Sequence, residues 1–196
     1  MVFEIHHIEG FDPTGRMFSR NVQVNVGENG YTGHCGYEGL TVQTNEYPTV
    51  EEVLNDLTKK LQKKGAEGHF DACWVLFDHA QKCNKIGDAV HHLRSLHAIN
   101  PLECARRIIE SPAEKPNQRK HILTQLVQQN NGNHTTYPFD PQICFTMNLL
   151  LAIESVKKDR VSDGDRDAAI AYIQQAFSFP VSEAFLETMQ PVFDAM

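Results

Sequence analysis

Glycine and proline are distributed unevenly along this chain, and that distribution restricts its fold more than any other feature of the sequence. Nine of the twelve glycines lie at or before Gly68, whereas seven of the nine prolines lie at or after Pro101. Glycine suits tight turns between strands, and proline marks the first turns of helices and the breaks between them. The sequence therefore predicts an α+β fold, with an N-terminal antiparallel β-sheet followed by helices.

The N-terminal strands are indicated by residues that alternate between apolar and polar. Over residues 21–26, Val22, Val24 and Val26 alternate with polar side chains, which is the period of a half-buried strand. Asn29 and Gly30 then supply a turn, because Asn-Gly tolerates the backbone angles of tight hairpins. The same alternation marks two further strands, at Phe3 and Ile5 and at Leu40 and Val42. We expect a sheet of three or four strands.

A helix over residues 49–65 has the clearest signals of any element. Thr49 and Glu52 form a capping box, in which each side chain satisfies a free N–H group of the first turn. Apolar residues then recur at helical spacing, and Gly65 is expected to end the helix because glycine is favoured just past a C-terminus. This helix completes a predicted β-rich subdomain of residues 1–68.

Residues 69–196 predict a bundle of about six helices. Residues 70–83 are apolar enough to form a buried helix or a buried strand, and we favour a helix. Asn100-Pro101 and Asp140-Pro141 each place a capping side chain before a proline at the first helical position. The helix after Pro141 is apolar on nearly all sides, so it is expected to be the central helix. We expect the bundle and the β-rich subdomain to share one core.

Composition excludes several classes of protein. The formal net charge is −7, from 18 Lys+Arg and 25 Asp+Glu, and non-specific nucleic-acid binding requires basic surfaces that neutralise phosphates. A membrane-spanning helix needs about 20 apolar residues, far more than the short apolar runs at 73–77 and 149–153. The five cysteines are odd in number and widely spaced, which argues against a disulfide framework. We expect a cytoplasmic protein that binds no nucleic acid and has no membrane-spanning segment.

One catalytic hypothesis rests on Cys35. The residue lies among glycines that would leave its thiol accessible, and a histidine such as the adjacent His34 would serve as its base. This arrangement would suit a cysteine-dependent hydrolase, deamidase or transferase. Neighbouring residues of a strand point to opposite faces, so His34 is a poor partner if the segment is extended. The alternative is that Cys35 fills a small space in the sheet, and we favour this alternative.

Metal and cofactor sites have weaker support. His79 and Cys83 are spaced for one face of a helix, but with Cys73 and His91 they match no zinc module. The acidic segment beginning at Asp163 resembles the opening of a calcium loop but lacks its later glycine and glutamate, so it is better explained as a helix start. The glycine-rich segment fits neither a phosphate-binding loop nor a dinucleotide fingerprint. We therefore predict no metal and no cofactor.

The C-terminal segment gives the strongest functional indication. Residues 159–196 contain seven acids and two bases, whereas residues 1–158 are nearly balanced. The same segment is crowded with large apolar residues that would either fold onto the core or contact a partner, and the candidates for partner binding are Phe177, Phe179, Phe185, Met189 and Phe193. We expect a small acidic, non-enzymatic adaptor or chaperone-like module, similar in size and charge to those of bacterial secretion systems, with a basic, apolar protein or peptide as its partner.

Overall fold

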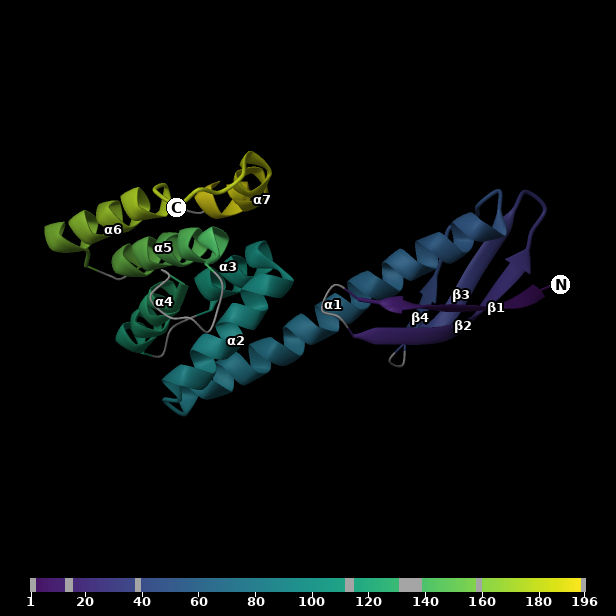
Figure 1. Cartoon of the computed structure of the whole chain (residues 1–196), viewed down its shortest axis with the longest axis horizontal. Helices are drawn as coiled ribbons and strands as arrows, with labels where there is room; N and C mark the ends of the chain where they lie inside the picture. Colours follow the sequence, from purple (N-terminus) through teal and green to yellow (C-terminus); the bar gives the residue numbers. More distant parts are fainter. Residues whose placement is uncertain are drawn as a thin grey trace. The chain divides into compact units, whose positions relative to one another are not determined.

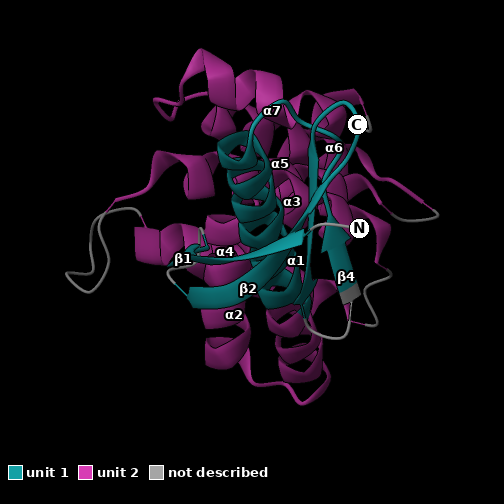
Figure 2. Cartoon of the chain, turned by 90° about the vertical axis from the view of Figure 1, so that its right-hand side faces the viewer, with its two compact units in different colours: residues 1–71 teal, residues 72–196 magenta. Residues whose placement is uncertain are grey.

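The chain folds into two compact units, residues 1–71 and 72–196, shown in different colours in Figure 2. The structure is a computed structural model that describes residues 3–12, 16–37, 40–111, 115–130, 139–157 and 160–194. It has an N-terminal antiparallel sheet and helices after it, so the predicted α+β fold is confirmed. The expectation that the two parts share a core stays a prediction.

The first unit is built on an antiparallel sheet (Figure 1), whose four strands lie side by side in chain order. A turn joins the second and third strands, with the Gly27 N–H donating to the Gly30 carbonyl at 2.8 Å. The strands are β1 (Phe3–Phe11), β2 (Met17–Val26), β3 (Tyr31–Tyr37) and β4 (Leu40–Gln43).

Helix α1 (Val50–Lys82) covers one face of this sheet with the first part of its length. Val53, Leu57 and Leu61 of α1 are fully buried against the apolar side of the strands. Gly33 of β3 makes this contact close, because a Cβ there would lie 2.9 Å from Leu57 Cδ1 and would overlap Val53. The capping box at Thr49 is present, with the Glu52 N–H donating to Thr49 Oγ1 and the Thr49 N–H donating to the Glu52 carboxylate.

The prediction that Gly65 ends this helix is wrong. Helix α1 continues through Gly65 and includes residues 70–82, which confirms that the apolar segment is helical rather than extended. Gly65 faces Asp12 and Tyr37, and a Cβ at this position would lie 2.7 Å from Asp12 Oδ2 and 3.2 Å from the Tyr37 hydroxyl oxygen. The glycine therefore provides space for tertiary packing, a requirement that the local sequence does not reveal.

We expect Gly65→Ala to destabilise the protein, although alanine is favoured over glycine inside helices by about 1 kcal/mol. The added methyl group would displace the buried Asp12. Gly87→Ala is the matched control, because no atom lies within 4 Å of a Cβ there and Gly87 is exposed on a helix. In chemical denaturation, Gly65→Ala should lower the free energy of unfolding and Gly87→Ala should raise it. Equal stabilisation by both substitutions would contradict the packing role of Gly65.

The second unit contains six further helices among its described residues. The buried helix α5 is central: every residue from Ile143 to Ser155 is buried, and α5 contacts α3, α4 and α6. Helix α3 also contacts α2 and α7. The helices are α2 (Ile86–Ile99), α3 (Pro101–Glu110), α4 (Pro116–Asn130), α5 (Pro141–Val156), α6 (Asp163–Ala176) and α7 (Glu183–Asp194). None of the described helices is long and apolar enough to cross a membrane.

Four of these helices begin at side-chain caps, including α7, where Ser182 Oγ accepts from the Phe185 N–H at 3.2 Å. Asn100 accepts from the Glu103 N–H at 3.0 Å before α3, and Asp140 accepts from the Gln142 N–H at 2.9 Å before α5. Both caps were expected from the sequence. Ser162 and Asp165 form a capping box at the start of α6. The acidic segment beginning at Asp163 thus starts a helix, which agrees with the interpretation preferred over a calcium loop.

Burial of α5 also buries polar side chains, and Thr146 among them has a partner on a neighbouring helix. His97 of α2 is 3% exposed, and its Nε2 lies 3.0 Å from Thr146 Oγ1 of α5. Burial lowers the pKa of His97 to about 4, from an ordinary value of 6.5, while the nearby Asp140 carboxylate partly opposes this shift. His97 is therefore a neutral hydrogen-bonding group of the bundle core at neutral pH.

The lowered pKa of His97 predicts a loss of stability in mild acid. The unfolded state binds a proton below about pH 6.5 and the folded state does not until about pH 4, so the stabilisation is present above pH 6.5 and lost as the pH falls toward 4. Between pH 7.5 and pH 5 the free energy of unfolding should fall by about 2 kcal/mol from this group. His97→Gln should reduce that pH dependence in urea titrations, whereas His121→Gln, at an exposed position of α4, should retain it.

Candidate functional site

The structure places Cys35 and His34 on opposite faces of the sheet. Cys35 is 4% exposed and belongs to the cluster of buried residues beneath α1. His34 is half-buried on the other face, where its Nδ1 lies 3.5 Å from Asn25 Nδ2. The two residues are therefore not brought together, as expected for neighbours on an extended strand.

The surroundings of Cys35 do not favour thiolate chemistry. Burial raises the pKa of its thiol, and the charge of Arg20 only partly offsets this effect. A nucleophilic cysteine requires an accessible thiol with a lowered pKa. The catalytic hypothesis remains a prediction, and the placement is the one expected for a small side chain that fills the sheet core.

Four phenylalanine rings form a connected cluster between α5 and the C-terminal helices, and two more form a separate pair. Phe145 of α5 is fully buried, and its ring packs edge-on against Phe177, Phe185 and Phe193, with centroid distances of 5.4, 6.0 and 6.1 Å. Phe177 also stacks on Phe193 at 6.1 Å. Phe179 lies 6.4 Å from the ring of Phe139. The C-terminal aromatics thus fold back onto the bundle.

The predicted partner-binding residues separate into buried and accessible groups. Phe185 and Met189 are buried, at 6% and 0% exposure, and contribute to the core. Phe177 is 57% exposed, and Phe179 and Phe193 are half-buried. We define the aromatic surface as the accessible members of this group together with Phe139, which is 50% exposed: Phe139, Phe177, Phe179 and Phe193.

An apolar groove lies beside α6, and we call it the α5/α6 groove. Its volume is about 600 Å³, and it is lined by Ile109, Ala152, Ile153, Val156, Lys157, Arg166, Ala169, Ile170 and Ile173. Two of its apolar side chains are accessible, Val156 at 40% and Ile170 at 53%. Seven of these nine lining residues are apolar and the other two are cations, so no carboxylate of the described part of the chain lines the groove.

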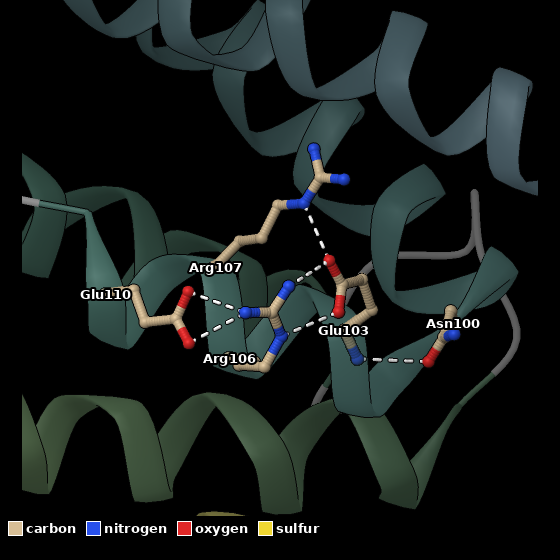
Figure 3. Close-up of polar contacts among 5 residues, drawn as sticks. All are labelled: Asn100, Glu103, Arg106, Arg107 and Glu110. Atoms are coloured by element: carbon tan, nitrogen blue, oxygen red, sulfur yellow. Dashed lines mark hydrogen bonds and ion pairs between the residues drawn. The ribbon is translucent and has the colours of Figure 1, made fainter.

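A second groove, of about 470 Å³, lies between α3 and α7. Its polar rim is formed by Glu103, Arg106 and Glu110, which Figure 3 shows linked along the surface of α3. Arg106 pairs with both carboxylates at 2.7 Å, and Glu103 also accepts from Arg107 at 2.8 Å. These charges neutralise one another, so this rim offers less charge to a ligand than the α5/α6 groove does.

The groove residues were not identified from the sequence. Arg166, Ala169, Ile170 and Ile173 are spaced at three and four residues along α6, a signal that places them on one helix face. The residues that complete the groove belong to α3 and α5, and no sequence pattern pairs these helices with α6. The described residues contain no group of three His, Cys, Asp or Glu side chains arranged to hold a metal ion.

Comparison of the chain with models of known protein families, with characterised proteins and with solved structures finds no match.

Thiol labelling tests the catalytic hypothesis. We expect iodoacetamide at pH 7.5 to modify the exposed Cys83 first, because Cys35, Cys73, Cys104 and Cys144 are buried and burial raises the pKa of each of their thiols. Peptide mapping over time gives the rate at each site, and Cys83→Ser removes the fast site for a second measurement. Faster labelling of Cys35 than of Cys83 would instead support a cysteine nucleophile.

Proposed function

We propose that this protein is a non-enzymatic, protein-binding module of the adaptor or chaperone type, and that its partner docks on the aromatic surface. The observation that carries the proposal is the exposure of Phe177, which is 57% accessible while it stacks on Phe193 and packs edge-on against the buried Phe145. A rigid, exposed aromatic side chain supplies large contact area at low entropic cost. Such residues are enriched in protein interfaces and their binding hot spots.

The charge next to this surface supports a basic, apolar partner. Helix α7 contributes Phe193 to the aromatic surface, and its acids Glu183, Glu187 and Asp194 are all exposed. The helix contains no basic residue. Opposite charges around an apolar contact accelerate association and select against acidic competitors. An acidic rim beside exposed aromatics is therefore complementary to a segment that carries both apolar and basic residues.

Affinity purification from the native host, with quantitative mass spectrometry, tests the proposal. We expect a specific protein to co-purify and to be lost at least tenfold with Phe177→Ser. Leu76→Ser is the matched control, because Leu76 is 49% exposed and lies outside the aromatic surface. Thermal unfolding of both variants checks that they remain folded.

Salt and charge variants then test the nature of the partner. Glu183→Lys with Glu187→Lys should weaken binding, and so should raising the ionic strength from 0.05 to about 0.5 M, because exposed charges are screened. Glu28→Lys, an exposed acid of the first unit, should leave binding unchanged. Recovery of the wild-type protein alone, or equal recovery of the partner with Phe177→Ser, would contradict the proposal.

A further inference from the structure

We propose that the α5/α6 groove is a binding site for a long-chain carboxylate, an anionic ligand with a linear apolar tail. This inference rests on the groove and does not depend on the proposed protein partner. Three features of the groove support it: the distribution of charge along the groove, the weak pairing of its two cations, and the apolar side chains that it leaves exposed.

Both cations of the groove lie at the same end. Lys157 caps the C-terminus of α5, and Arg166 lies in the first turns of α6. Only residues 157–162 connect the two helices, so the end of α5 is adjacent to the start of α6. The rest of the lining, including Ala169, Ile170 and Ile173, extends from this end along α6. The groove is therefore cationic at one end and apolar along its length.

Within the part of the chain that the structure describes, the two cations remain available to an anion. The Lys157 Nζ donates to the backbone carbonyl of Ile109, and no carboxylate of the described residues forms an ion pair with it. Arg166 lies 3.5 Å from Asp163, but both side chains are mostly exposed, at 66% and 96%. Exposed pairs of this kind are worth little and are readily exchanged. In the groove between α3 and α7, by contrast, Arg106 is already held by two carboxylates.

The apolar part of the groove has the size and exposure expected of a ligand site. Its volume of about 600 Å³ falls in the range of about 300–1,000 Å³ typical of small-molecule sites. Val156 and Ile170 are substantially exposed, although the burial of large apolar side chains is favourable. The alkyl chain of the ligand would lie along α6 and cover both side chains, and its carboxylate would pair with Lys157 and Arg166. A neutral or cationic amphiphile would cover the same surface but would lack that ion pairing.

Isothermal titration of the full chain with dodecanoate, below its micelle concentration, tests the proposal. We expect saturable 1:1 binding that is at least tenfold tighter than binding of dodecyltrimethylammonium or octanoate. The double substitution Lys157→Gln with Arg166→Gln should weaken dodecanoate binding about tenfold or more. The matched control is Arg160→Gln, an exposed cation between α5 and α6 that does not line the groove.

Methyl NMR spectra locate the site independently of affinity. Dodecanoate should shift the signals of Ile109, Ile153, Ile170 and Ile173, which line the groove, and leave Ile8 of the first unit unchanged. Equal affinity for the anionic and cationic amphiphiles, unchanged affinity of the double variant, or shifts confined to other isoleucines would each overturn the proposal. The Phe177→Ser variant should bind dodecanoate normally, so failure of this inference is distinguishable from failure of the proposed function.

Discussion

Burial of α5 on all sides is the constraint on which the second unit depends. An isolated helix of this composition would expose apolar side chains in every direction, so it requires neighbours on each of its faces. Helices α3, α4 and α6 supply contacts, and the ring of Phe145 receives the aromatic side chains of α7. The C-terminal phenylalanines are thus explained first by the burial of α5. Burial does not explain the exposed part of the Phe177 side chain, which is open to a functional explanation.

The same burial sets the requirements for polar groups in the core. Thr146 forms a hydrogen bond with His97 of α2. Within α5, Asn148 donates to the Cys144 carbonyl at 2.7 Å and Ser155 donates to the Leu151 carbonyl at 2.8 Å. Glu154 is buried 3.7 Å from Arg119, whose guanidinium also donates to the Ser111 carbonyl at 2.8 Å. Removal of one partner of such a pair leaves a buried charge without compensation, at a cost of about 3–5 kcal/mol. The His97–Thr146 and Arg119–Glu154 contacts therefore link α2 and α4 to α5.

Local signals were sufficient to predict the beginnings of helices but not their contacts. Asn100 and Asp140 act as caps because their side chains bond to N–H groups two or three residues away. The role of Gly65 depends on Asp12, which is distant in sequence. The aromatic residues show the same limit, since the sequence does not reveal that Phe185 is buried and Phe177 exposed. That difference arises from how α7 packs against α5.

The two candidate binding surfaces meet on one helix face of α6. Ile173 lines the groove, and Phe177 lies one turn further along, at the spacing where side chains of a helix are neighbours. The charges differ between the surfaces, because cations lie at the far end of the groove and exposed acids of α7 lie beside the aromatic surface. The two surfaces therefore favour different classes of occupant, an anion with an apolar tail in the groove and a basic, apolar segment at the aromatic surface.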